Sequence, residues 1–175
     1  IVRFERADGL ISWGRLESGV IRAIPGEAGS LRNFLEAKAW KQQPVREEFK
    51  VAEVRFLSPV TAPCQIICQG KNYLDHLLET GANPKNKDYN ILFTKADSAL
   101  APPVGDINRP QGVRLLDYEL ELGLVIGTEI RGPKEVTEGN LHEFVAGLVM
   151  GNDVSARDIQ VPQRQWFKGK SFRGF

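Results

Sequence analysis

The sequence is poor in cysteine. Its 175 residues include only Cys64 and Cys68. Neither has a second cysteine or a histidine at zinc-ligand spacing, and on one strand the pair would lie too far apart to form a disulfide. We therefore expect two buried free thiols in a reducing cytoplasm and no catalytic cysteine, because nothing nearby would lower a thiol pKa.

An excess of charge of one sign and a long hydrophobic segment are also missing. Lys plus Arg number 23 against 22 for Asp plus Glu, which gives a net charge of +1. No basic block is interleaved with aromatic residues, so we expect no nucleic-acid partner. The longest apolar runs, such as LGLVIG, are too short to span a membrane, and we recognise no secretion signal. These features predict a cytoplasmic protein without a membrane partner. Because residue 1 is not methionine, we expect the sequence to begin inside a longer chain or after processing.

The sequence contains enough hydrophobic residues to form a core. Hydrophobic residues make up 42% and charged residues 26%, as in ordinary soluble domains. The prolines of SPVTAP indicate a linker, so we expect a small domain over residues 1–60 and a larger one over 61–175.

The first domain combines strand and helix signals. The runs IVRF, LISWGRL and SGVIRAI are separated by Gly-containing turns, which predicts a β-meander. Ser30 is a candidate N-cap, because Leu31, Phe34, Leu35 and Ala39 follow it at helical spacing.

The stretch LLDYELELGLVIG carries Glu119 and Glu121 inside an apolar strand. Successive side chains of a strand point to opposite faces, so the two carboxylates share one face, about 7 Å apart. Such a pair is costly unless the face is wet, a proton is shared, or a cation lies between the charges. The residues alone leave these alternatives open. We expect the other face to be core; it is formed by Tyr118, Leu120, Leu122, Leu124 and Ile126.

Three further motifs of the larger domain carry chemically useful groups. GNDVSARDIQ follows a strand, NYLDHLLE places a histidine and a glutamate three residues apart on one helical face, and KGKSF carries two lysines. Each has an ordinary explanation: a turn cap, a surface ion pair and solvated lysines. Their joint occurrence favours a site. The candidate site residues in these three motifs are His76, Glu79, Asp153, Arg157, Asp158, Gln160, Lys168 and Lys170.

In combination these motifs resemble the fumarylacetoacetate hydrolase family, in particular its acylpyruvase-like and oxaloacetate decarboxylase-like members. The resemblance runs from Ile67 to Phe172, through CQGKNYLDHLLETG, ILFTKADSAL, LDYELELGLVIG, VAGLVMGNDVSARDIQ and QWFKGKSF, in the family's order and at about its spacing. It implies an α+β, β-rich fold in which a mixed sheet is rolled into a barrel or sandwich, behind a small N-terminal β-rich domain. It also implies a homodimer.

Two features depart from the family pattern. Arg173 follows Lys-Ser-Phe, where the family often has an aspartate. The sequence stops at Phe175, where family members continue through a further stretch of the same barrel. We therefore expect the larger domain to be C-terminally incomplete.

The resemblance implies a divalent metal cofactor, with magnesium as the first choice and manganese or calcium as alternatives. The implied metal ligands are Glu119, Glu121 and Asp153. The implied catalytic residues are His76, oriented as a general base by Glu79, and Lys170. Arg157 and Gln160 are the implied substrate-binding residues. The segment from Asn83 to Asn90 is a candidate lid hinge.

The substrate that this resemblance implies is a small 2-oxo acid. We expect hydrolysis of a C–C bond in an acylpyruvate or related β-diketo acid, through a metal-stabilised enolate, with water activated by the His-Glu pair. The alternative reactions do not hydrolyse a C–C bond. They are decarboxylation or tautomerisation of oxaloacetate, and isomerisation or hydration of an unsaturated 2-oxo diacid from aromatic catabolism. A third hypothesis is a non-catalytic, metal-stabilised binding module.

Overall fold

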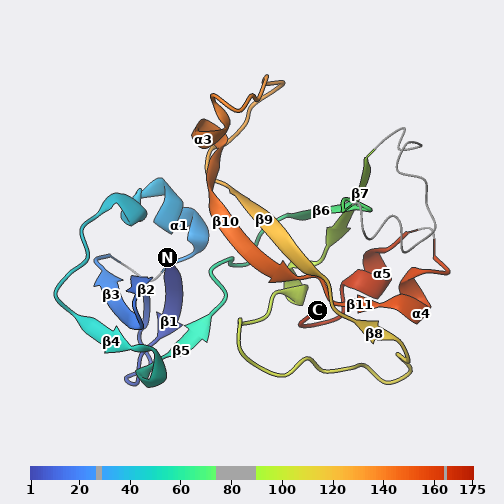
Figure 1. Cartoon of the computed structure of the whole chain (residues 1–175), viewed down its shortest axis with the longest axis horizontal. Coiled ribbons are helices and arrows are strands. Elements are labelled where there is room, and N and C mark those ends of the chain that lie inside the picture. Colours follow the sequence, from blue (N-terminus) through green and yellow to red (C-terminus); the bar gives the residue numbers. More distant parts are fainter. Residues whose placement is uncertain (27–28, 74–89, 164) are drawn as a thin grey trace. The chain divides into compact units, whose positions relative to one another are not determined.

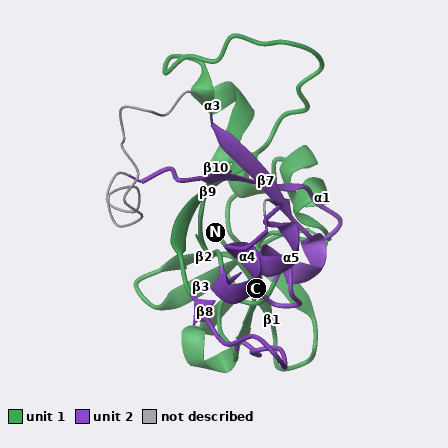
Figure 2. Ribbon diagram, turned by 90° about the vertical axis from the view of Figure 1, so that its right-hand side faces the viewer, with its two compact units in different colours: residues 1–61, 101–106, 118–153 green, residues 62–100, 107–117, 154–175 purple. Residues whose placement is uncertain are grey.

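The computed structural model describes residues 1–26, 29–73, 90–163 and 165–175, and its strands outnumber a few short helices (Figure 1). The chain forms two compact units (Figure 2). Unit 1 comprises Ile1–Thr61, Ala101–Asp106 and Tyr118–Asp153. Unit 2 comprises Ala62–Leu100, Ile107–Asp117 and Val154–Phe175. The first break lies beside the expected linker, while residues 118–153 of the larger sequence domain group with the N-terminal residues.

Unit 1 begins with a five-stranded antiparallel sheet of order β4-β3-β2-β1-β5. The strands are β1 (Val2–Glu5), β2 (Ile11–Glu17), β3 (Val20–Ile24), β4 (Glu48–Lys50) and β5 (Arg55–Leu57). Gly9 and Gly19 adopt φ of 81° and 80°, which lets the chain reverse between the first three strands. The predicted meander is therefore confirmed.

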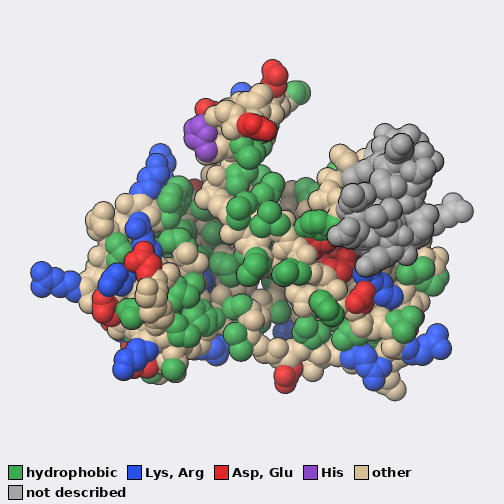
Figure 3. All heavy atoms as spheres, viewed as in Figure 1, with side chains coloured by type: hydrophobic (Ala, Val, Ile, Leu, Met, Phe, Trp, Pro, Cys, Tyr) green, Lys and Arg blue, Asp and Glu red, His purple; other side chains and the backbone are tan. Residues whose placement is uncertain are grey.

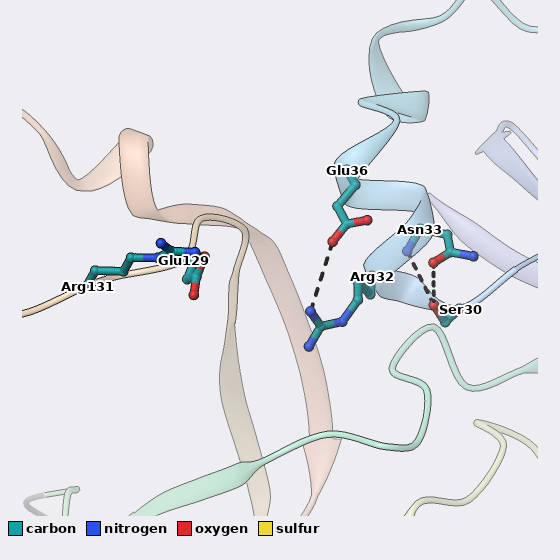
Figure 4. Close-up of polar contacts among 6 residues, drawn as sticks. All are labelled: Ser30, Arg32, Asn33, Glu36, Glu129 and Arg131. Atoms are coloured by element: carbon teal, nitrogen blue, oxygen red, sulfur yellow. Dashed lines mark hydrogen bonds and ion pairs between the residues drawn. The ribbon is translucent and has the colours of Figure 1, made fainter.

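The helix α1 (Leu31–Glu36) begins where the sequence predicts. The backbone N–H of Asn33 donates to Ser30 Oγ at 3.3 Å, and Arg32 pairs with Glu36 one turn later (Figure 4). The helix is shorter than its apolar spacing suggests, because Ala39 lies in a separate 3₁₀ turn, η1 (Ala39–Lys41). Another 3₁₀ turn, η2 (Val51–Glu53), links β4 to β5.

Two aromatic residues attach α1 to the sheet. Phe34 stacks on Trp13 of β2, with ring centroids 4.3 Å apart, and both side chains are buried. On the other face of the sheet Phe4 and Ile21 are fully buried. The N-terminal sheet therefore has covered apolar residues on both of its faces.

Unit 1 also contains a hairpin of β9 (Leu120–Ile126) and β10 (Val145–Asn152). The short helix α3 (Leu141–Phe144) runs directly into β10. The antiparallel register places Leu120 opposite Asn152 and Glu121 opposite Gly151, with an irregularity near Val145.

The apolar face of this hairpin is not a core, so that prediction is wrong for the chain as it stands. Its residues on β9, with Tyr118 just before the strand, are 54–77% exposed, and Leu148 and Met150 of β10 are 64% and 77% exposed. Figure 3 shows hydrophobic side chains at the surface of the chain. Alternation determines which side chains share a face, but a face becomes core only when another element covers it. No element in the described part of the chain does so here.

Unit 2 consists of two strand pairs and short helices. β6 (Ile66–Gly70) pairs with β7 (Ile91–Lys95), and β8 (Leu116–Asp117) pairs with β11 (Ser155–Ala156). The helices are η4 (Asp97–Ala99), α4 (Arg157–Gln160) and α5 (Phe167–Lys170).

The core of unit 2 is a small apolar cluster. It consists of Val113, Val154, Ala156 and Phe175, with Ile159 and Phe172 packed against them. The expected β-rich α+β composition is confirmed, although every strand pair among the described residues is antiparallel, where a mixed sheet was expected. None of the helices among these residues has the length and hydropathy needed to cross a bilayer.

Candidate functional site

The three predicted metal ligands lie at one end of the β9–β10 hairpin. The backbone N–H of Asp153 donates to the Glu119 carbonyl at 2.8 Å, so these residues continue the register of the two strands. The backbone N–H of Glu119 in turn donates to Asn152 Oδ1 at 3.2 Å. Because directly paired residues of an antiparallel hairpin share a face, Glu119, Glu121 and Asp153 lie on the same side. This is the half-buried face, opposite the exposed apolar one.

Three carboxylates on one face repel one another unless a cation or a proton compensates them. Glu121 lies opposite Gly151, which has no side chain, so the register leaves room beside its carboxylate. The oxygen donors match the preference of a hard divalent cation such as Mg²⁺. Their side chains do not converge in this structure: within the described residues, no three His, Cys, Asp or Glu side chains form a metal-holding group. Residue type and register fit a hard divalent cation.

Arg157 lies in unit 2, at the start of α4, and its guanidinium is held from two sides. Nε and Nη2 donate to Asp117 Oδ2 at 2.9 and 2.8 Å, and Nη1 donates to Gln160 Oε1 at 2.9 Å. The β8–β11 pairing puts Ser155 opposite Asp117, which fixes the carboxylate beside the helix start. The structure therefore brings the two predicted substrate-binding residues together.

Asp158, in α4, hydrogen-bonds to the backbone of residues 114–115, which precede β8. Its carboxylate accepts hydrogen bonds from the backbone N–H groups of Arg114, at 2.9 Å, and Leu115, at 3.4 Å. The bond from the Arg114 N–H is the main cause that lowers the pKa of Asp158. The backbone N–H of Arg157 donates to the Leu115 carbonyl at 2.8 Å, so side-chain and backbone bonds hold α4 in one place.

Lys170, the predicted catalytic lysine, is buried at the end of α5 with 2% of its surface exposed. Its Nζ lies over the ring of Phe93 in β7, 5.2 Å from the centroid. The neighbouring Ser171 accepts a hydrogen bond from the backbone N–H of Ala96 at 3.0 Å, which ties the Lys-Ser-Phe motif to the end of β7. Lys168, two residues earlier, is exposed.

The remaining predicted residues lie outside the described part of the chain, at its surface or in partly buried positions. His76, Glu79 and residues 83–89 of the expected lid hinge lie outside the described residues, so their roles stay predictions. The side chain of Arg173 is exposed. Cys64 and Cys68 form no disulfide and are only partly buried, which corrects the expectation of burial. Burial raises the pKa of the Cys64 thiol, which is the opposite of what a nucleophile needs.

Sequence reasoning missed two residues that contact the predicted site residues. Asp117 stands two positions before Glu119, so its place in LDYELE could have drawn attention to it. Nothing in ILFTK distinguishes Phe93 from an ordinary strand aromatic. Its contact with Lys170 joins residues 77 positions apart and is visible only in the fold.

Fold and side chains together define a class of protein. It is a β-rich chain in which one hairpin presents three carboxylates on a single face, and a second compact unit holds a lysine, an arginine and a glutamine on two short helices. Carboxylate oxygens are donors that a hard divalent cation prefers, and lysine and arginine side chains are groups that attract anions.

The chain belongs to the fumarylacetoacetate hydrolase family. Residues 65–175 match the family model for the fumarylacetoacetate (FAA) hydrolase C-terminal domain, and residues 1–59 match an Rv2993c-like N-terminal model. A rat protein named oxaloacetate tautomerase Fahd2a, mitochondrial, is 38% identical over 126 residues, which cover 71% of this chain and 38% of the rat protein. The chain thus spans well under half of that relative.

Solved structures of the family share the fold. A fumarylacetoacetate hydrolase from Exiguobacterium antarcticum superposes with a TM-score of 0.80 at 35% identity, over 99% of this chain and 62% of the other. A 2-hydroxyhepta-2,4-diene-1,7-dioate isomerase from Mycobacterium marinum gives a TM-score of 0.69 at 27% identity, over 99% and 61%. The expected family and fold class are therefore confirmed.

Proposed function

We propose that this chain belongs to an enzyme that shifts a proton within a small 2-oxo dicarboxylate, by keto–enol tautomerisation or double-bond isomerisation. The observation that carries the proposal is the shared face of Glu119, Glu121 and Asp153 on the β9–β10 hairpin. The names of two relatives support the reaction class, since one is an oxaloacetate tautomerase and the other a dienedioate isomerase. These reactions are the alternative that the sequence left open beside C–C hydrolysis.

The proposed cofactor is a divalent cation held by these three carboxylates, with magnesium first and manganese or calcium as alternatives. When bound, such a cation supplies Lewis acidity that stabilises negative charge developing on a keto oxygen. The chain's own contribution is to place three carboxylate side chains on one face of the hairpin. That arrangement is otherwise electrostatically unfavourable.

The residues of unit 2 supply positive charge and orientation. Lys170 carries its ammonium in a buried setting, where its field is weakened less by water than at the surface. Arg157, held by Asp117 and Gln160, is suited to bind a substrate carboxylate through its planar guanidinium. His76, oriented by Glu79, is the proposed base that takes a proton from the carbon next to the carbonyl; both roles come from the family resemblance.

C–C bond hydrolysis of an acylpyruvate is the second candidate. The His-x-x-Glu pair His76 and Glu79, which that reaction needs to activate water, is intact in the sequence. The Exiguobacterium protein, whose TM-score of 0.80 exceeds the 0.69 of the Mycobacterium marinum isomerase, is named a fumarylacetoacetate hydrolase. Both reactions begin with polarisation of the keto group of a 2-oxo acid, but the acids differ, so substrate preference separates the two candidates.

A side-by-side assay tests the proposal. Enol-oxaloacetate, keto-oxaloacetate and acetylpyruvate are offered separately with Mg²⁺, and ketonisation, decarboxylation and C–C cleavage are followed. We expect ketonisation of enol-oxaloacetate to be the fastest reaction and EDTA to abolish it. Cleavage of acetylpyruvate alone would establish the second candidate instead. Metal-dependent thermal stabilisation without turnover of any 2-oxo acid would identify a binding module.

Two lysines of α5 provide a matched pair for this assay. Lys170→Met removes the buried ammonium, and we expect kcat/KM to fall about 100-fold, the range of a lost electrostatic contact to the reacting group. Lys168→Met removes an exposed ammonium two residues away and should leave kcat/KM unchanged. Equal effects of the two substitutions would remove Lys170 from the mechanism.

A further inference from the structure

The ammonium of Lys170 is packed on an aromatic ring. Lys170 is one of the largest fully buried side chains, and its Nζ lies 5.2 Å from the centroid of the Phe93 ring. The face of an aromatic ring carries partial negative charge and attracts a cation within about 6 Å of its centre, most strongly where water is excluded. The ring is therefore placed to offset part of the hydration that Lys170 loses on burial.

The position of the Phe93 ring is itself fixed. Phe93 pairs with Cys68 in the β6–β7 ladder. Trp166 meets its ring edge-on, with centroids 5.4 Å apart and an interplanar angle of 67°. The Trp166 indole can occupy this position against Phe93 because Gly70 of β6 has no side chain. A Cβ at residue 70 would overlap the indole.

The helix that carries Lys170 is held from a second side. The backbone N–H of Lys170 donates to the Trp166 carbonyl at 3.1 Å, so one turn presents both residues to the same Phe93 ring. On the side toward α4, a Cβ at Gly169 would come within 2.7 Å of Gln160, which shows how closely the two helices approach. The strand pairing and the Trp166 indole fix the Phe93 ring, and the helix contacts fix Lys170, so the distance between ring and ammonium is set from both sides.

We propose that Phe93 is a positioning residue for Lys170: the ring holds the ammonium where it acts on the anionic substrate, without touching the substrate itself. The inference rests on the proposed function only for the role of Lys170. The ring contact itself can be measured in the protein without substrate. Because the contact is electrostatic, its strength follows the electron density of the ring rather than the size of the side chain.

Fluorination of Phe93 tests this dependence on electron density. Mono-, di- and trifluorinated phenylalanine at position 93 withdraw electron density from the ring face with little change in shape. We expect kcat for enol-oxaloacetate to fall with each added fluorine, while KM changes less than twofold. Phe93→Leu should lower kcat about tenfold, in line with a desolvated cation–π contact, and Phe93→Tyr should restore most of it. Phe167→Leu, an exposed aromatic on α5, is the matched control and should leave kcat unchanged.

A spectroscopic measurement tests the contact without turnover. With lysine labelled at Cε, the methylene protons next to Nζ of Lys170 should resonate upfield of all other lysines, because they lie over a ring face. Lys170→Met assigns the signal. Phe93→Leu should return it to the ordinary range, and Phe93→Tyr should leave it upfield.

The two measurements separate the inference from the proposed function. An upfield signal combined with the stepwise loss of kcat establishes the positioning role. A signal in the ordinary range, or an unchanged kcat across the fluorinated series, overturns it. If no 2-oxo acid is turned over, the proposed function fails, and the resonance alone then decides whether Phe93 holds Lys170.

Discussion

The N-terminal sheet and the β9–β10 hairpin are both antiparallel, and both alternate large apolar side chains with other residues. In the sheet, Phe4 and Ile21 are fully buried on one face and Trp13 lies under α1 on the other. In the hairpin, the apolar face is the exposed one and the acidic face is half-buried. The same sequence pattern has thus led to two different environments.

The difference shows what a hydrophobic pattern specifies. Alternation sets which residues share a face, whereas burial depends on what packs against that face. The N-terminal sheet has its covering helix close in sequence, at residues 31–36. The hairpin has no such cover in the described chain, and the solved relatives that superpose on this chain are longer, since it spans 62% of one and 61% of another.

The largest effect should come from truncating one apolar residue in each region. Phe4→Ala removes a fully buried ring, and we expect the free energy of unfolding to fall by about 3–5 kcal/mol. Leu122→Ala removes a side chain that is 58% exposed, so we expect a change of less than about 0.5 kcal/mol. Urea unfolding of the two variants and the parent chain gives both values.

The same unfolding measurement can contradict the exposure of the hairpin's apolar face. If Leu122→Ala destabilised the chain as much as Phe4→Ala, the apolar face of the hairpin would be covered in solution. A second copy of the chain is then the first candidate cover, and a dependence of the unfolding midpoint on protein concentration would identify it.

The acidic face of the hairpin should show the next largest effect. Glu121→Gln keeps the size of the side chain but removes one proposed metal ligand, so we expect kcat/KM with Mg²⁺ to fall about 100-fold or more. Glu129→Gln is the matched control. Its carboxylate is exposed and pairs with Arg131 in the loop beyond β9 (Figure 4), so kcat/KM should stay within about twofold. Equal losses in both variants would contradict a special role for the hairpin face.

A smaller effect is expected just before the hairpin, at Asp117. Asp117→Asn keeps an oxygen acceptor but removes the charge that holds the Arg157 guanidinium. We expect KM for a 2-oxo dicarboxylate to rise about five- to tenfold with little change in kcat, because a charge-assisted hydrogen bond at a partly exposed site is weakened. A fall in kcat at constant KM would contradict this positioning of a binding group.

Sequence reasoning succeeded where the signals were local. The N-cap at Ser30, the three-strand meander and the shared face of Glu119 and Glu121 follow from turn chemistry and from the alternation of strands. It failed where long-range packing decides, as in the exposure of Leu122, and it made no prediction of the burial of Lys170. The Arg157–Asp117 pair needed the β8–β11 ladder, which joins segments about 40 residues apart.

The smallest effect should be a pH dependence of stability from Asp158. Its pKa is lowered in the folded chain, mainly by the hydrogen bond from the Arg114 backbone N–H. A lowered folded-state pKa means that the contribution is present above the unfolded-state pKa, near pH 4, and is lost as the pH falls through the folded value. Asp158→Asn should therefore flatten the acid limb of a plot of melting temperature against pH. An acid limb identical to that of the parent would contradict this assignment.

We propose that Glu119, Glu121 and Asp153 jointly hold one divalent cation. Electron paramagnetic resonance tests it directly, because the signal of free Mn²⁺ falls as the ion binds. We predict one Mn²⁺ bound per chain, displaced by excess Mg²⁺ and lost in a Glu119→Gln/Glu121→Gln double variant. Absence of bound Mn²⁺ in the parent chain, or equal binding by the double variant, would contradict the claim.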